Sequence, residues 1–250
     1  MEKSGELYRS DVEEFVRDDW ANALKNCPVP SYHMLQNLGL FLNSKNLSRI
    51  LFFNHIYQLI LDVPGIVVEF GTRWGNTLSL FAALRGIYEP FHRHRKIVGF
   101  DTFTGFPEIG EKDNPKCSMM HKGGLACTEN YEQYLEQIMN FQENDNPMSH
   151  IKKFEICAGD ATIEVDKYFE KYPESIVALA FFDFDIYEPT KKCLEAIKKR
   201  LVKGSVVAFD EINDHDSPGE TVALDEVFGL SNIRLKRLPV TARLSYFIVE

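Results

Sequence analysis

Short apolar segments alternate with helical ones along this chain of 250 residues, and the alternation predicts an α/β fold. The apolar segments are short and continuous, as expected for parallel strands that helices cover on both faces. Two of them end on an acid, the first beside a pair of glycines, which is typical of the ligand-binding edge of a Rossmann-like sheet. We therefore predict a Rossmann-like, mostly parallel sheet over residues 63–250, preceded by a helical cap over residues 1–62.

The predicted elements follow one another in a regular order. In the cap, apolar residues from Leu47 to Leu61 recur at helical spacing. The strand candidates are then Ile66–Phe70, Lys96–Phe100, Phe154–Cys157, Ile176–Phe182 and Ser205–Phe209. The helical stretches between them are Asn76–Arg85, Tyr131–Phe141, Ala161–Lys171 and Pro189–Leu201. The last two apolar segments are joined by a short proline-containing link and predict a closing antiparallel hairpin, Ile233–Leu238 and Leu244–Val249.

One connection, residues 106–150, is too long for a plain loop. Its first half is rich in glycine, proline, lysine and small polar residues. It follows the strand that ends on Asp101, so it leaves the sheet at the ligand-binding edge. We predict that this insertion acts as a lid over the active site.

Composition excludes several classes of function. The formal net charge of −9 argues against a nucleic-acid partner, and no apolar run approaches the ~18 residues that span a membrane. The acidic N-terminus has no apolar core, so we expect no signal peptide. The five cysteines are widely spaced without a CxxC pair, which favours a reducing cytoplasm over a disulfide framework or a zinc site. A homodimer is compatible with the helical N-terminus and the short edge strands.

The stretch after the first predicted strand indicates which cofactor is bound. Glu69, Gly71 and Gly75 do not form the GxGxxG pattern of a dinucleotide site. The glycines allow a sharp turn, and the helix that follows points free N–H groups at a ligand. Glu69 would repel a pyrophosphate but suits an ammonium or sulfonium group, and Asp101 can accept hydrogen bonds from ribose hydroxyls. This combination predicts S-adenosylmethionine (SAM).

Four further acids follow the two later parallel strands: Asp183, Asp185, Asp210 and Glu211. Because the carboxyl ends of parallel strands meet at one edge, we expect these carboxylates to gather there. Crowded carboxylates repel one another, and a hard cation such as Mg²⁺ relieves that repulsion. The alternative is that some of the acids cap helices: Asp185 precedes a predicted helix, and Asp214 or Asp216 precedes a helix near Glu220.

Four motifs together resemble the macrocin O-methyltransferase family. They are EFGTRWG at 69–75, FDTFTGFP at 100–107, DFDIYEPT at 183–190 and DE at 210–211. The resemblance extends from Val63 to Phe228, and the DxDxYxxT pattern is its most specific part. It implies a class I SAM-dependent methyltransferase sheet and the methylation of a sugar hydroxyl in a natural-product pathway.

The resemblance also implies residue roles. Asp183, Asp210 and Glu211 would be Mg²⁺ ligands, and Asp185 would be the general base. Glu211 stands where the family usually has aspartate, and the 106–150 insertion is unfamiliar. We expect the cofactor to be bound by Glu69, Gly71, Thr72, Gly75, Asn76, Thr77, Asp101, Thr102, Phe103 and Asp183, with Gly159, Asp160 and Ala161 bordering the adenine.

The predicted function is SAM-dependent, Mg²⁺-assisted O-methylation of a sugar or sugar-containing natural product, with a glycoside or nucleotide sugar as acceptor. A catechol-type O-methyltransferase would use a metal ion in the same way, on an aromatic diol, and remains an alternative. A SAM-binding protein without catalysis is another, because Glu211 departs from the family pattern. A NAD-dependent oxidoreductase is disfavoured, because Asp101 lies 30 residues beyond Gly71, whereas a dinucleotide fold places its acid about 20 residues on.

Overall fold

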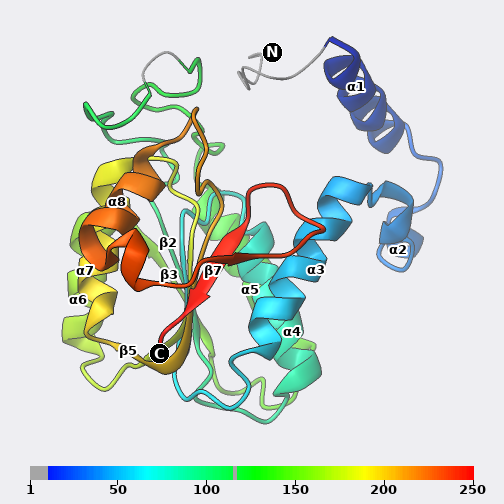
Figure 1. Ribbon diagram of the computed structural model, residues 1–250. Helices are drawn as coiled ribbons and strands as arrows, with labels where there is room; N and C mark the ends of the chain where they lie inside the picture. Colours follow the sequence, from blue (N-terminus) through cyan, green and yellow to red (C-terminus); the bar gives the residue numbers. More distant parts are fainter. Residues whose placement is uncertain (1–10, 115–116) are drawn as a thin grey trace.

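The computed structural model describes residues 11–114 and 117–250 and has one seven-stranded sheet (Figure 1). Its strands are β1 (Ile66–Phe70), β2 (Ile97–Asp101), β3 (Phe154–Ala158), β4 (Val177–Phe182), β5 (Leu201–Phe209), β6 (Lys236–Arg237) and β7 (Ser245–Ile248). The order across the sheet is β3-β2-β1-β4-β5-β7-β6. Strands β1 to β5 are parallel, and β7 runs antiparallel to both β5 and β6. The predicted mostly parallel sheet with a closing antiparallel hairpin is confirmed.

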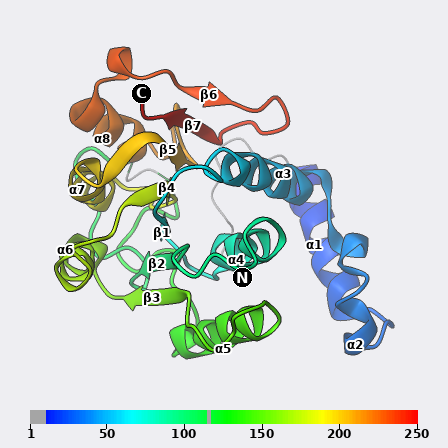
Figure 2. The ribbon, with the colours of Figure 1, turned by 90° about the horizontal axis from the view of Figure 1, so that it is seen from below.

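Helices cover both faces of this sheet, as the apolar strands require (Figure 2). One face carries α3 (Ser44–Gln58), α4 (Asn76–Tyr88) and α5 (Tyr131–Asn144). The other carries α6 (Ala161–Lys171), α7 (Tyr187–Lys198) and α8 (Gly219–Phe228). Every residue of β1 and β4 is buried, because these central strands are covered on both sides.

Four phenylalanines stack across the carboxyl ends of neighbouring strands. Phe70 of β1 stacks on Phe100 of β2 and on Phe182 of β4, with ring centroids 5.1 and 4.7 Å apart. Phe182 in turn stacks on Phe209 of β5 at 5.2 Å. Phe100, Phe182 and Phe209 immediately precede Asp101, Asp183 and Asp210. The aromatic row therefore aligns the strand ends from which three of the predicted site acids emerge.

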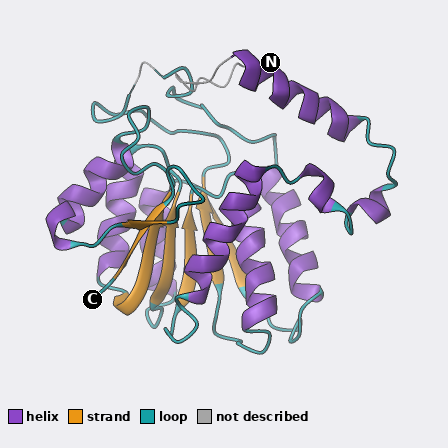
Figure 3. Cartoon of the chain, turned by 45° about the vertical axis from the view of Figure 1, so that its right-hand side comes forward, coloured by secondary structure: helices purple, strands orange, loops and turns teal. Residues whose placement is uncertain are grey.

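The N-terminal segment has two parts. Helix α1 (Asp11–Lys25), helix α2 (Ser31–Met34) and the short 3₁₀ helix η1 (Leu38–Phe41) stand away from the sheet (Figures 1 and 3). By contrast, α3 buries Phe52, Phe53, Ile56 and Tyr57 in the core. The division into a cap at 1–62 and a main domain at 63–250 stays a prediction, and residues 1–10 of that cap lie outside the described chain. No helix in the described part of the chain is both long and apolar enough to cross a membrane.

Most element boundaries differ from the sequence prediction by a few residues, and the changes in α7 and β5 are the most informative. Helix α7 begins at Tyr187, before Pro189, because a proline in the first turn costs no helical hydrogen bond. Strand β5 begins at Leu201, which pairs with Val177, so the predicted helix Pro189–Leu201 is too long at its end. The helix at Tyr131–Phe141 is confirmed, extends to Asn144 and belongs to the layer that covers the sheet.

Candidate active site

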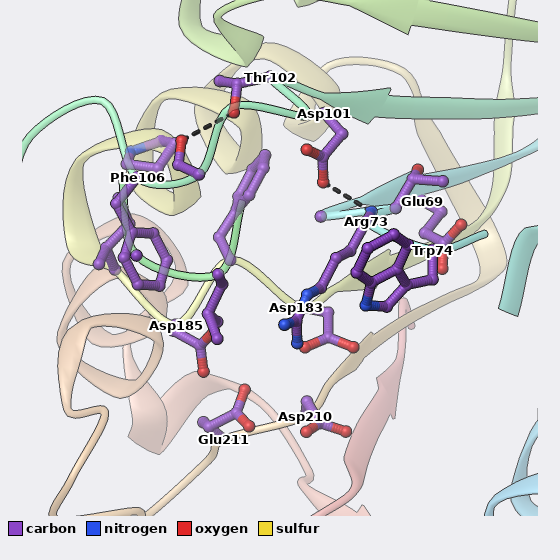
Figure 4. A pocket seen from close by; sticks show the side chains of 18 of the residues that line it. Glu69, Arg73, Trp74, Asp101, Thr102, Phe106, Asp183, Asp185, Asp210 and Glu211 are labelled. Carbon is purple, nitrogen blue, oxygen red and sulfur yellow. Dashed lines mark hydrogen bonds between the residues drawn. The ribbon is translucent and has the colours of Figure 1, made fainter. Parts of the chain in front are cut away.

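A cavity of about 440 Å³ lies at the carboxyl ends of β1, β2, β4 and β5 (Figure 4). Most of the residues predicted from the sequence line it: Glu69, Gly71, Thr72, Asn76, Thr77, Asp101, Thr102, Asp160, Ala161, Asp183, Asp185, Asp210 and Glu211. Gly75, Phe103 and Gly159 are not part of the lining. The sheet thus brings the predicted cofactor acids and the predicted metal acids into one cavity.

Glu69 places a buried carboxyl group at the cofactor side of the cavity. It is the fourth residue of β1, and its Oε2 is buried with no hydrogen-bond partner among the described residues. Burial raises the pKa of Glu69 well above its ordinary value. A buried carboxyl oxygen without a partner is costly, so this position suits a ligand that brings its own positive charge, such as the ammonium group of SAM.

The glycine turn next to Glu69 is set by the chain itself. Gly71 has a φ of +92°, a conformation that favours glycine. A Cβ at this position would lie 2.0 Å from the carbonyl oxygen of Asp183. The first glycine therefore lets the loop after β1 pass against the end of β4, which brings the cofactor loop next to Asp183. Gly75 (φ +71°) ends the turn as the N-cap of α4 and packs against Leu135.

Asp101 is held rigidly by two backbone amides. Its Oδ2 accepts from the amide of Arg73 at 2.7 Å, and its Oδ1 accepts from the amide of Phe103 at 2.6 Å. Burial raises its pKa. Each carboxylate oxygen keeps a second lone pair, so a ribose hydroxyl could still be bound. Phe103 and Gly159 hold Asp101 through their backbone amides: Phe103 donates to its side chain, and Gly159 donates to its carbonyl oxygen at 2.8 Å.

Asp160 has a structural task that the sequence analysis did not assign. Its Oδ1 caps helix α6, accepting from the amide of Thr162 at 2.9 Å and from the Thr162 hydroxyl at 2.7 Å. The opposite wall is apolar and comes from the insertion, which contributes Phe106, Met119 and Leu125. An apolar wall in the same cavity as Asp101 suits an adenine ring.

The insertion is tied to the sheet domain through Asp113. This buried side chain accepts from the amide of Tyr187, the first residue of α7, at 2.8 Å, and from the amide of Gly110 at 2.9 Å. Asp113 therefore supplies the N-terminal cap that Ile186, the local N-cap residue, cannot provide. Among the described residues of the predicted lid, those that line the cavity fall within 106–125, because α5 lies on the sheet.

The later acids form a compact cluster. Asp183, Asp210 and Glu211 each place one carboxylate oxygen within 4.8 Å of the others. They do not cap the helices that follow, because α7 and α8 have Ile186 and Pro218 as N-cap residues without side-chain capping bonds. Burial and the neighbouring carboxylates raise the pKa values of Asp183 and Glu211 well above ordinary values. The capping alternative is wrong for Asp185, which is not the N-cap residue of α7, and the cluster is the better explanation of the other three acids.

Two arginines that the sequence analysis missed lie on this cluster. Arg49 of α3 pairs with Asp210 and, at 3.4 Å, with Asp183. Arg243 pairs with Asp210 at 3.3 Å, with Glu211 at 3.1 Å and with Asp214 at 3.0 Å. Burial alone would raise the pKa of Asp210, but a hydrogen bond with Glu211 and the two guanidinium groups hold it below its ordinary value.

Asp185 differs from the three clustered acids. It has a φ of +61°, which is unusual for a residue with a side chain. Its only hydrogen bond among the described residues is a long one of 3.4 Å from the hydroxyl of Ser217. Burial, followed by the charge of Asp210, raises the pKa of Asp185 to about 7. A carboxylate with few partners and a pKa near neutrality suits proton transfer.

The cluster fits a hard divalent cation. Three carboxylate oxygens are the donor set that Mg²⁺ prefers, and Glu211 Oε2 is buried without a partner among the described residues. The longer side chain of Glu211 still reaches the cluster. Fold and site together define a class I, SAM-type methyltransferase architecture.

The similarities to known proteins agree with this class. Two solved structures of the calicheamicin methyltransferase CalS11 match: one at 38% identity and a TM-score of 0.93, covering 96% of this chain and 94% of that one. The other, described as an apo TDP-rhamnose 3'-O-methyltransferase, matches at 36% identity and a TM-score of 0.84, covering 96% of both chains. The O-methyltransferase NovP shares the fold at 19% identity and a TM-score of 0.61, over 81% of this chain and 79% of its own. No family model and no curated protein sequence matches the chain.

The chain therefore belongs to the macrocin O-methyltransferase-like family and is a SAM-dependent methyltransferase. The oxidoreductase alternative is set aside by the same similarity.

Proposed function

We propose that this enzyme transfers a methyl group from SAM to a hydroxyl of a sugar, carried by a nucleotide or in a glycoside, with the help of Mg²⁺. The observation that carries the proposal is that Glu69 and Asp101 line the same cavity as the cluster of Asp183, Asp210 and Glu211. The similarity to a TDP-rhamnose 3'-O-methyltransferase over 96% of the chain supports a sugar acceptor.

In this proposal different residues bind the cofactor, bind the metal and accept the proton. Glu69 and Asp101 orient the cofactor, and Asp183, at the adjoining strand end, belongs to both the cofactor and the metal side of the cavity. When bound, SAM supplies the methyl group and Mg²⁺ a positive charge that lowers the pKa of the acceptor hydroxyl. Asp185 accepts the proton of that hydroxyl on a carboxylate oxygen. The apolar wall of Phe106, Met119 and Leu125 excludes water from the reacting groups.

The first test is a calorimetric titration of SAM and of NAD into the purified protein, with and without Mg²⁺. We expect SAM to bind and NAD to give no heat, because Glu69 repels a pyrophosphate. Turnover is then measured with TDP-rhamnose, a rhamnoside and a catechol as acceptors, each with and without EDTA. Methylation of the catechol alone would replace the sugar assignment. Absence of SAM binding would overturn the roles given to Glu69, Gly71 and Asp101.

We also propose a homodimer that uses the N-terminal helices, in a reducing cytoplasm that suits five widely spaced cysteines. Phe15 of α1, Tyr32 of α2 and Leu35 are 68, 75 and 72% exposed, and large exposed apolar side chains favour association. Light scattering should give twice the mass of one chain, and a Phe15→Glu, Leu35→Glu variant should shift the mass towards a single chain. A wild-type protein with the mass of one chain at micromolar concentration would contradict the dimer.

A further inference from the structure

Arg49 occupies the gap between two of the proposed metal ligands. Its Nη1 donates to Asp210 Oδ1, and its Nη2 donates to Asp183 Oδ2 at 3.4 Å. Asp183 and Asp210 follow neighbouring strands, β4 and β5, so one guanidinium group spans both strand ends. Because the nearest oxygens of the two acids and of Glu211 lie within 4.8 Å of one another, a divalent cation held by all three would have to sit where Arg49 now bridges.

Arg49 and a metal ion would compete for the same acids. Arg49 already binds one oxygen of Asp210 and one of Asp183, and a divalent cation held by the cluster would need oxygens of both residues. Two cations placed this close repel each other, and the repulsion is poorly screened in a half-buried site.

Arg49 is the arginine placed to leave. Both of its carboxylate partners belong to the triad, and its guanidinium group lies 5.5 Å from the centre of the Phe53 ring one helical turn further along α3. Such a ring can continue to hold a displaced cation. Arg243 flanks the cluster instead, because it also binds Asp214, which lies outside the triad.

We propose that Arg49 is a displaceable counter-ion of the metal site, holding Asp183 and Asp210 together in the metal-free enzyme and leaving them when a divalent cation binds. This inference rests on the metal site proposed above. It gives α3 a part in the catalytic cycle, because each metal-binding event moves a side chain of that helix within the cavity. In the metal-free enzyme, the charge of Arg49 would offset the repulsion between Asp183 and Asp210 at the ends of β4 and β5.

The first test measures Mn²⁺ affinity by electron paramagnetic resonance, with no acceptor or turnover involved. Arg49→Met should bind Mn²⁺ more tightly, by on the order of tenfold, because the metal no longer has to displace a cation. Arg49→Lys keeps the charge and should stay near the wild type. Arg93→Met is the matched control: Arg93 is exposed and donates a hydrogen bond to His94, so its loss removes the same charge away from the cluster and should leave the affinity unchanged.

The second test asks whether Arg49 actually leaves. Without metal, Arg49→Met should unfold at a lower temperature than the wild type, since Asp183 and Asp210 lose a counter-ion. At saturating Mn²⁺ the two melting temperatures should converge. In the wild type the metal has then displaced Arg49 from the acids, and in the variant no guanidinium group is present to bind them. For Arg243→Met, which removes a flanking arginine that stays in place, the gap from the wild type should persist with Mn²⁺.

The outcomes separate this inference from the function on which it rests. If Mn²⁺ binds neither the wild type nor Arg49→Met, the proposed metal site falls, and the counter-ion role falls with it. If the wild type binds Mn²⁺ but Arg49→Met binds it equally or more weakly, Arg49 is not a competitor. A melting gap for Arg49→Met that persists at saturating Mn²⁺ would likewise overturn displacement while leaving the metal site intact.

Discussion

Asp185→Asn is expected to abolish methyl transfer while leaving the affinity for SAM nearly unchanged. Asparagine has almost the same shape but cannot accept the proton of the acceptor hydroxyl. General-base catalysis typically contributes about 10²–10⁴-fold to a rate, so kcat should fall by at least the lower figure. Asp185 lies in the same cavity as Glu69 and Asp101 without being hydrogen-bonded to either. The cofactor side of the cavity should therefore tolerate the change.

The measurement is transfer of a labelled methyl group at saturating SAM, combined with calorimetric titration of SAM into the same variant. Asp216→Asn is a suitable control, because Asp216 follows in the loop before α8 but does not line the cavity. Near-normal turnover in Asp185→Asn would remove Asp185 from the role of base. Loss of SAM binding together with turnover would mean that Asp185 supports the cofactor instead.

Much of the fold follows from local pattern. Strand β1 was predicted with its exact bounds, because its five apolar or buried residues are followed at once by the glycine turn. The acids of the cavity were found because each follows an apolar run, and parallel strands bring their ends to the same edge. Rows such as Phe70, Phe100 and Phe182 reinforce this, since the strand that carries each ring must be in register with its neighbours.

The counter-ions of those acids could not be found in this way. Arg49 lies in a helix that precedes the sheet, 134 residues before Asp183, and nothing in its local sequence indicates a partner. Arg243 lies in the link before β7, and only the antiparallel pairing of β7 with β5 brings it beside Asp210. The apolar wall from the insertion was missed for the same reason, because its packing against Ile186 is a tertiary contact between distant segments.

Asp210→Asn is expected to destabilise the protein and to abolish methyl transfer. Asp210 is 4% exposed, and its two carboxylate oxygens accept from two arginines, Arg49 and Arg243. Loss of the charge leaves both guanidinium groups short of a partner. Breaking a fully buried ion pair costs about 3–5 kcal/mol. We expect a smaller loss here, because the side chains of Arg49 and Arg243 are 32 and 43% exposed and the amide oxygen of asparagine still accepts one hydrogen bond. The free energy of unfolding is measured by denaturant titration without metal.

The same variant tests the metal role in a second way. Mn²⁺ should raise the melting temperature of the wild type by mass action, and that increase should be largely lost in Asp210→Asn because one of three oxygen ligands carries less charge. Glu226→Gln is the matched control: Glu226 pairs with Lys112 and Lys191 at the surface and should affect stability far less and the Mn²⁺ response not at all. Retention of methyl transfer and of the full Mn²⁺ response in Asp210→Asn would exclude Asp210 as a ligand. Loss of both with unchanged stability would mean instead that Asp210 serves the metal and that its arginine pairs contribute little to the fold.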